Sequence, residues 1–231
     1  MAFPYDQTPA ENMIDGQLAP NGITHQGLLA SVRSVARELF VPLSLMHNAY
    51  VDEDMVFGDG RFLMEPLTQL KLLQALKPKA TESVLIIGGA TGYSAALLAP
   101  LVARICMVEQ DHALAAKAHD ILEKTHCSNV HVVQNKHAEG AAGMAPYDAI
   151  LLEGAVEHIP QIIFDQLKEG GRLFSVVTKH VRPTARLGTK MGMGHATRYE
   201  KHHGKISSEP LFDAGVGMLS GFENPATFSF H

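Results

Sequence analysis

A turn of small residues follows the aliphatic run from Val84 to Ile87 and comprises Gly88, Gly89, Ala90 and Gly92. The run is typical of a buried strand, and a helix is expected directly after the turn. In parallel sheets, ligands bind at the carboxyl ends of strands, where glycines allow close approach and a helix start offers free N–H groups. The pattern indicates a nucleotide-type cradle, although a glycine turn can also serve packing alone.

Glu109 and its neighbour Gln110 stand at the end of the next aliphatic run, Ile105 to Val108. An acid about 20 residues after a glycine turn can accept hydrogen bonds from both hydroxyls of a ribose. A solvated strand end is the alternative. The glycines do not follow the G-x-G-x-x-G spacing of nicotinamide sites. They fit the G-x-G-x-G pattern of methyltransferases better, with Ala90 in the middle, and so favour S-adenosylmethionine over NAD.

Aliphatic runs and helical patterns alternate along the chain from Ser83 onward. Strands are expected near 84–87, 105–108, 130–133, 149–152 and 172–177, and helices near 95–101, 112–125 and 160–167. This alternation predicts parallel βαβ units and an α/β, Rossmann-like fold with a doubly wound, mostly parallel sheet. Two amphipathic helices are expected ahead of it, at 24–41 and from about Pro66 to Leu76.

We therefore divide the chain into an amino-terminal helical extension with a substrate loop, 1–80, and a Rossmann-like domain, 81–231. The stretch 178–205 holds seven basic residues and one acid, Glu200, with few large apolar residues. We expect it to form a loop or a hairpin connection. Residues 221–230 carry alternating phenylalanines and are expected to form a final strand.

Composition restricts the classes of protein and partner. With 231 residues, 46% of them hydrophobic, the chain can bury a sizeable core, which excludes a disordered or fibrous protein. The net charge of −5 provides no global field for nucleic acid or an anionic membrane. Two cysteines, no signal-peptide pattern and no apolar span favour the cytoplasm. The loop histidines His195, His202 and His203 show no tight metal-ligand spacing, so no metal is expected.

Several short motifs resemble the protein-L-isoaspartate O-methyltransferase family, in that family's order from about residue 12 to 177. Besides the turn at 84–99, they are Asp15-Gly16-Gln17-Leu18, Arg37-Glu38-Leu39-Phe40-Val41-Pro42, Ala49-Tyr50, Asn129 to Val133, Pro146-Tyr147-Asp148-Ala149-Ile150, and Gln166 to Leu173. The resemblance implies a Rossmann-like domain that uses S-adenosylmethionine. It also implies methyl transfer to the carboxylate of an isoaspartyl residue in a protein or peptide, which starts the repair of damaged protein.

The loop expected to close over the substrate departs from the family pattern. Met64 stands where family members carry a serine held to be important for catalysis, and a thioether cannot donate a hydrogen bond to a carboxylate. Glu65 beside it would repel a carboxylate substrate. Arg61 could offset that charge by pairing with Glu65 or by binding the substrate carboxylate in a fork. An ordinary surface pair is the alternative.

Cofactor contacts depart from the family pattern as well. Ile86 replaces an acid that contacts the methionine end of the cofactor, and 134–140 lacks the Gly-Asp-Gly whose aspartate meets the adenine. We expect Asn135 or Glu139 to take that role, and Glu153 and Gly154 to face the methyl side of the pocket. Two alternatives stay open: a methyltransferase with another, small-molecule acceptor, and a non-catalytic binding module. The oligomeric state cannot be derived from the sequence.

Overall fold

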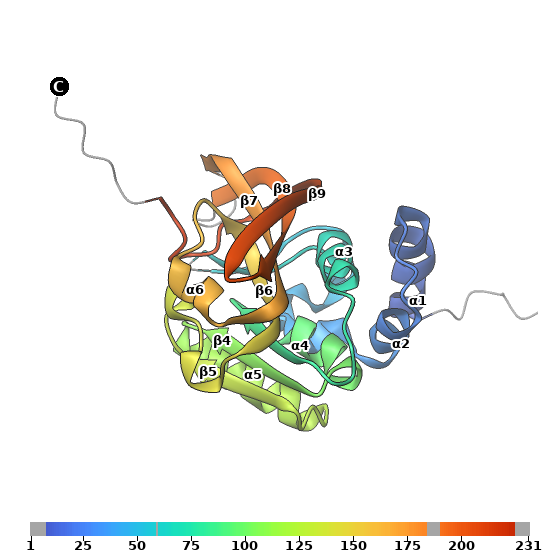
Figure 1. The fold of residues 1–231 in the computed structure, drawn as a ribbon. Coiled ribbons are helices and arrows are strands. Elements are labelled where there is room, and N and C mark those ends of the chain that lie inside the picture. Colours follow the sequence, from blue (N-terminus) through green and yellow to red (C-terminus); the bar gives the residue numbers. More distant parts are fainter. Residues whose placement is uncertain (1–7, 59, 184–189, 225–231) are drawn as a thin grey trace, which may run out of the picture.

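The fold is given by a computed structural model that describes residues 8–58, 60–183 and 190–224 (Figure 1). The α-helices in these ranges are α1 (Pro9–Met13), α2 (Gln26–Ser34), α3 (Pro66–Leu76), α4 (Tyr93–Leu98), α5 (His112–Lys124) and α6 (Gln161–Asp165). The strands are β1 (Met55–Gly58), β2 (Arg61–Leu63), β3 (Ser83–Ile87), β4 (Arg104–Glu109), β5 (Val130–Gln134), β6 (Tyr147–Val156), β7 (Leu167–Pro183), β8 (Lys190–His202) and β9 (Lys205–Gly217).

Strands β3 to β9 form one sheet in the order β5-β4-β3-β6-β7-β8-β9, and β1 and β2 form a separate two-stranded ribbon. The pairs from β5 to β7 are parallel, whereas β7, β8 and β9 pair antiparallel. The predicted doubly wound, mostly parallel sheet is confirmed. Because β3 is followed in sequence by β4 on one side and is paired with β6 on the other, the strand order reverses at β3. Ligands of open α/β sheets bind at such a reversal.

Alternate residues of the central strands point to opposite faces of the sheet and enter two cores. Val84 and Ile86 of β3 pack into a core shared with α1 to α5, whereas Leu85 and Ile87 pack into a second core with α6. The first core thus contains residues from both predicted parts of the chain, 1–80 and 81–231. The division between these two parts stays a prediction.

The first predicted helix is shorter than its apolar pattern. The pattern predicted 24–41, but α2 runs from Gln26 to Ser34 and its amino end is capped by His25, whose Nδ1 accepts from the N–H of Leu28 at 3.2 Å. The backbone is extended at Val35, and a short 3₁₀ helix follows from Arg37. This break lets Arg37 enter the core, where it is fully buried.

The carboxyl-terminal half contains more strand than predicted. Strand β7 continues through the expected loop region to Pro183, and β8 begins at Lys190, so the basic stretch is built mainly as a hairpin of paired strands. Pairing with β8, which continues as far as Pro183 opposite Lys190, explains the extension. Of the predicted final strand, 221–224 lie in no strand, and 225–230 lie outside the described residues.

Candidate functional site

The predicted strand, glycine turn and helix lie at the carboxyl end of β3. Gly88 has a φ of 79° and Ala90 a φ of 48°, both in the left-handed region that favours glycine. The N–H of Gly88 donates to the carbonyl of Val108 at 2.8 Å, which ties the turn to the end of β4. Gly92 then caps α4. The turn therefore lies next to the last residue of β4, Glu109, as the sequence predicted.

Glu109 is fully buried, and both of its oxygens bind groups of the protein itself. Nε and Nη2 of Arg61 lie 3.2 and 2.5 Å from Oε1 and Oε2. The backbone N–H of Ala90 donates to Oε2 at 2.9 Å, and that of Asp111 donates to Oε1 at 3.0 Å. Nε2 of His137 lies 3.3 Å from Oε1. Since a carboxylate offers about four lone-pair positions, the predicted contact with ribose hydroxyls has no acceptor left in this arrangement.

The electrostatic surroundings hold Glu109 in its charged form. Burial raises the pKa of Glu109, but a hydrogen bond from His137 and the positive charge of Arg61 outweigh burial and bring the pKa from 4.5 to about 2. Arg61 is only 4% exposed. The two side chains thus form a buried, ionised pair, and removal of one partner would leave the other charge uncompensated.

Arg61 reaches this position from β2 and has one donor without a partner. Its Nη2 also donates to the carbonyl of Gly88 at 2.9 Å. Its Nη1 is buried, and within the part of the chain that the structure describes it finds no acceptor. The sequence predicted that Arg61 would pair with Glu65 or bind substrate. It pairs with Glu109 instead, because β2 turns the side chain inward under the glycine turn.

Leu219 covers the glycine turn from the opposite side. A methyl group added at Gly88 would overlap Cδ1 of Leu219, and one added at Gly154 would lie 2.9 Å from its Cβ. Leu219 is fully buried, and its N–H donates to the carbonyl of Ala155 at 2.9 Å. The end of β3 and the facing part of β6 are therefore in contact with this leucine.

Neighbouring bonds hold the segment around Leu219 in place. The side-chain amide of Gln110 donates to the hydroxyl of Ser220 at 2.7 Å, so this predicted cofactor residue also binds the protein. Nδ1 of His137 lies 3.2 Å from the carbonyl of Ser220. The backbone N–H groups of Glu157 and His158 donate to the carbonyl of Phe222. The segment Met218–Phe222 thus bridges the ends of β4 and β6.

The candidates expected near an adenine, Asn135 and Glu139, contact groups of the protein itself. Nδ2 of Asn135 donates to the carbonyl of Gly140 at 2.9 Å. Glu139 is half-exposed and lies 3.4 Å from Nζ of Lys136. The side chain that this segment contributes to the site is His137, which the sequence reasoning missed. The one signal in the sequence was that His137 lies within 134–140, the segment that departs from the family pattern.

Glu153 belongs to a buried polar network under the turn. Its carboxylate bonds the hydroxyl of Ser94, and Nε2 of Gln69 lies 3.2 Å from the same oxygen. Gln69 in turn accepts from Nη1 of Arg37 at 2.8 Å. Burial raises the pKa of Glu153, and the bonds from Ser94 and Gln69 only partly oppose it. Sequence reasoning placed Glu153 near the pocket but missed Gln69 and the role of Arg37.

The last two residues of the loop before α3, Met64 and Glu65, are buried and half-buried. Met64 is 2% exposed and packs in the first core, and its carbonyl accepts from Nη2 of Arg37 at 2.6 Å. Glu65 is half-buried, accepts from the hydroxyl of Thr68, and has its pKa raised by burial. Its backbone N–H donates to Asp54 at 2.9 Å. Met64 and Glu65 therefore stabilise the start of α3.

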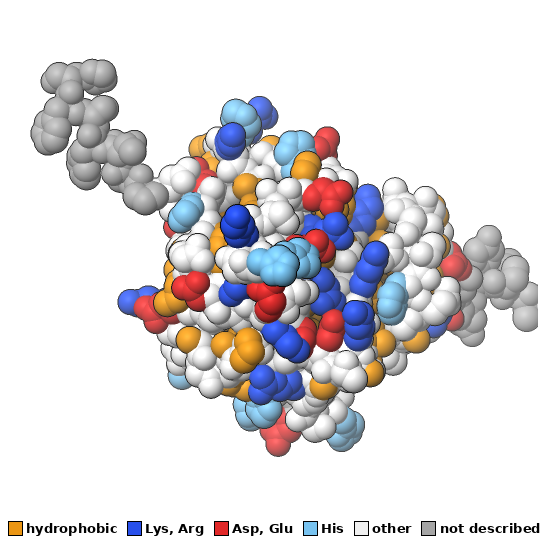
Figure 2. Space-filling model, in the orientation of Figure 1, with side chains coloured by type: hydrophobic (Ala, Val, Ile, Leu, Met, Phe, Trp, Pro, Cys, Tyr) orange, Lys and Arg blue, Asp and Glu red, His pale blue; other side chains and the backbone are white. Residues whose placement is uncertain are grey.

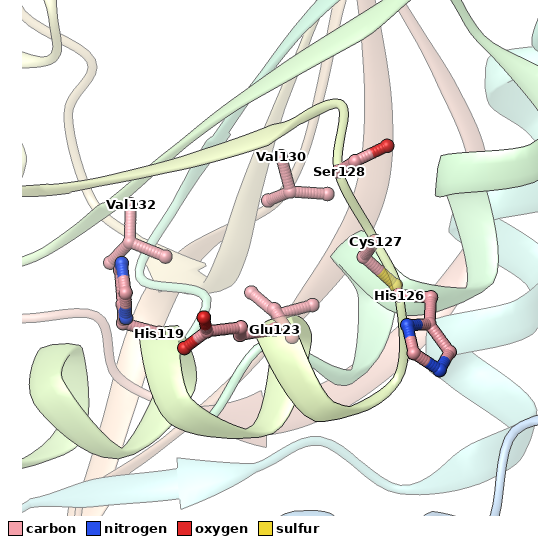
Figure 3. A pocket seen from close by; sticks show the side chains of 8 residues that line it. His119, Glu123, His126, Cys127, Ser128, Val130 and Val132 are labelled. Carbon is pink, nitrogen blue, oxygen red and sulfur yellow. The ribbon is translucent and has the colours of Figure 1, made fainter.

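A surface pocket lies between α5 and β5 (Figure 3). His119 and His126 lie at opposite ends of it, with Glu123 between them (Figure 3). Among the residues given a position, no group of three or more His, Cys, Asp or Glu side chains could hold a metal ion. The pocket therefore presents scattered polar groups and no metal centre.

Charged side chains at the surface are mixed in sign. On the face drawn in Figure 2, lysines and arginines lie among aspartates and glutamates. Three ion pairs link basic and acidic residues of β6 to β9 and the turn before β3, at 2.7, 2.8 and 2.6 Å: Lys168–Asp148, Arg172–Glu82 and Arg198–Glu209. None of the helices within 8–58, 60–183 and 190–224 has the length and apolar character needed to cross a bilayer.

Comparison with known sequences finds one family. The sequence model of protein-L-isoaspartate(D-aspartate) O-methyltransferases matches residues 9–203. A protein-L-isoaspartate O-methyltransferase of Methanoculleus marisnigri is 36% identical over 167 residues, which cover 72% of this chain and 76% of the relative. One of Opitutus terrae is 34% identical over 200 residues, covering 87% and 80%.

Comparison with solved structures finds the same fold. A protein-L-isoaspartate O-methyltransferase superimposes with a TM-score of 0.74 at 23% identity, and the match covers 92% of this chain and 66% of that one. A second neighbour is a putative enzyme of this kind from Plasmodium falciparum in complex with S-adenosyl-L-homocysteine. Its TM-score is 0.73 at 16% identity, with 93% and 99% covered. At these identities the likeness shows the fold alone.

Proposed function

The chain belongs to the protein-L-isoaspartate(D-aspartate) O-methyltransferase family, and from that membership we propose that it is an S-adenosylmethionine-dependent methyltransferase. Its acceptor is the carboxylate of an isoaspartyl residue in a protein or peptide. The observation that carries this proposal is the match of the family model over residues 9–203, most of the chain. The strand, turn and acid of the expected cofactor region are all present.

The acceptor makes few chemical demands on the protein. An isoaspartyl carboxylate is ionised near neutral pH, so no general base is needed to activate it. The protein must hold the acceptor in line and exclude water. Met64 is buried in the core. Its lack of a hydroxyl is compatible with this requirement, because holding the acceptor in line does not depend on a hydroxyl at position 64.

The side chains at the turn do not fit S-adenosylmethionine in the arrangement described. Both oxygens of Glu109 are engaged, and Leu219 fills the space beside Gly88 and Gly154. Binding requires that Arg61 and Leu219 move.

We extend the proposal to the biological setting. Methylation of an isoaspartyl carboxylate is the first step in repair of damaged protein, so the partners are peptides or proteins that carry this lesion. A cytoplasmic location is supported by Cys106 and Cys127, which are both free thiols. The pairing of surface basic residues with acids supports a role without nucleic acid.

The test is methyl transfer from labelled S-adenosylmethionine to a peptide that contains isoaspartate, with the same peptide containing ordinary aspartate as the control. Label in the isoaspartyl peptide alone supports the proposal. Cofactor binding with label in neither peptide would instead favour the small-molecule acceptor. If neither wild type nor Arg61→Ala, in which the contacts of Arg61 at the glycine turn are removed, binds the cofactor, a binding module without catalysis is favoured.

A further inference from the structure

We propose that Arg61 and Leu219 form an internal plug in the cofactor cleft, and that the chain binds S-adenosylmethionine only when the plug opens. This inference rests on the proposed function and concerns the regulation of its site. The plug, defined as these two side chains, lies where the strand order reverses at β3, the place at which open α/β sheets bind their ligands.

Arg61 occupies both oxygens of Glu109, the acid expected to hold a ribose. Its Nε and Nη2 take one contact on each carboxylate oxygen, and Nη2 also bonds the carbonyl of Gly88. The two remaining positions are taken by the N–H groups of Ala90 and Asp111. The backbone donors belong to the glycine turn and to the cap of α5 and are fixed by those elements, so Arg61 is the side chain whose departure would free a position on both oxygens together.

Leu219 blocks the other half of the same crevice. It lies against Gly88 at the end of β3 and against Gly154 in β6, the two strands between which the ligand site is expected. Glycines at such positions normally let a ligand approach the backbone. Here Leu219 of the chain itself occupies the space beside these two glycines.

The two parts of the plug are buried, but neither lies in a strand of the parallel sheet. Arg61 lies in the two-stranded ribbon, and Leu219 follows β9 in a segment joined to β6 by an isolated bridge, Ala155 to Met218. A methyl group added at Gly217, the last residue of β9, would overlap the ring of Phe62, so the ribbon packs on the end of β9 from which this segment continues. The opening that we propose therefore moves both parts together and leaves the pairing of the parallel strands intact.

The closed arrangement also leaves a polar group unsatisfied. Nη1 of Arg61 is buried and has no acceptor among the described atoms. A buried donor without a partner opposes the closed state.

The experiment compares binding of S-adenosylmethionine by calorimetry in wild type, Arg61→Ala and Leu219→Ala. We expect Arg61→Ala to bind at least about tenfold more tightly than wild type, because the charged contact to Glu109 no longer has to be broken. Arg172→Ala is the matched control, since Arg172 forms a comparable two-bond pair with Glu82 at the opposite end of the sheet. It should lose stability without a gain in affinity.

Hydrogen exchange of wild type keeps the inference testable if a variant fails to fold. Addition of S-adenosylmethionine should increase exchange in 55–63 and 218–222, as the plug opens. Tight binding by wild type with no gain in Arg61→Ala, or protection of both segments on binding, would overturn the plug and leave the proposed function intact. Absence of binding in all variants would overturn both.

Discussion

Glu109→Gln is expected to remove a defined, pH-dependent part of the stability. The folded pKa of Glu109 is about 2, against an ordinary value of 4.5. Since the folded pKa is the lower one, the ionised carboxylate stabilises the fold above pH 4.5, and this contribution is lost as the pH falls toward 2. The gap of about 2.5 corresponds to about 3 kcal/mol, at about 1.36 kcal/mol per pH unit.

That magnitude agrees with a second argument from the structure. Glu109 is fully buried, so solvent screening does not reduce the interaction. Loss of one partner from a buried ion pair costs about 3–5 kcal/mol, because the remaining charge, here Arg61, stays in the interior. We therefore expect the variant to be about 3 kcal/mol less stable than wild type near neutral pH.

The assay is urea denaturation of wild type and Glu109→Gln at a series of pH values. Other carboxyl groups titrate in both proteins and cancel in the difference. The difference should be largest near neutral pH and should narrow as the pH falls below 4.5. Glu139→Gln is the control, because its pair with Lys136 is exposed and worth at most about 1 kcal/mol. A difference that does not change with pH would refute the reasoning.

Three further substitutions test neighbouring features. Met64→Ser should lower the free energy of unfolding by about 2–5 kcal/mol in urea denaturation, because it opens a cavity in the core. It should not raise isoaspartyl methylation, and increased methyl transfer would contradict the buried placement of Met64. Glu153→Gln should be at least as stable as wild type above neutral pH. The raised pKa of Glu153 means that ionisation of its carboxyl weakens the fold as the pH rises. Lower stability of the variant at high pH would contradict the upward direction of this pKa shift. Gly194→Ala should cost about 1–3 kcal/mol, since its methyl group would overlap the backbone carbonyl of Val177. In Gly143→Ala the added methyl would meet open space, so equal losses would refute the steric argument.

The sequence was sufficient for elements whose signals are local. The aliphatic run before Gly88 and the periodic leucines from Pro66 to Leu76 specify β3 and α3, because burial of one face follows directly from spacing. The same reasoning placed Glu109 at the strand end next to the turn. This reasoning overestimated the length of α2, because an apolar stripe cannot show that Arg37 must leave the helix to reach the core.

The partners of the candidate residues could not be predicted, because distant contacts decide them. Arg61 and Glu109 are 48 residues apart, and no pattern near either one indicates a pair. Leu219 looks like any other apolar residue in the sequence, and only the return of the chain after β9 places it on the glycine turn. The prediction that Arg61 pairs with Glu65 failed because it considered only neighbours along the chain.

A shared closed state makes a quantitative prediction for the double variant. When only a fraction of molecules is open, the apparent affinity is the affinity of the open state reduced by that fraction. If about one molecule in a hundred is open, no substitution that acts by opening can raise affinity more than about a hundredfold. Because Phe62 packs over Gly217, Arg61 and Leu219 should be released together.

Gains from Arg61→Ala and Leu219→Ala should therefore not multiply in the double variant, and the second substitution should add little once the first has opened the cleft. Calorimetric titration of the four proteins with S-adenosylmethionine measures this coupling as a double-mutant cycle. Gains that multiply would mean that the two side chains are separate obstacles, each displaced on its own, and the single two-part plug would have to be abandoned.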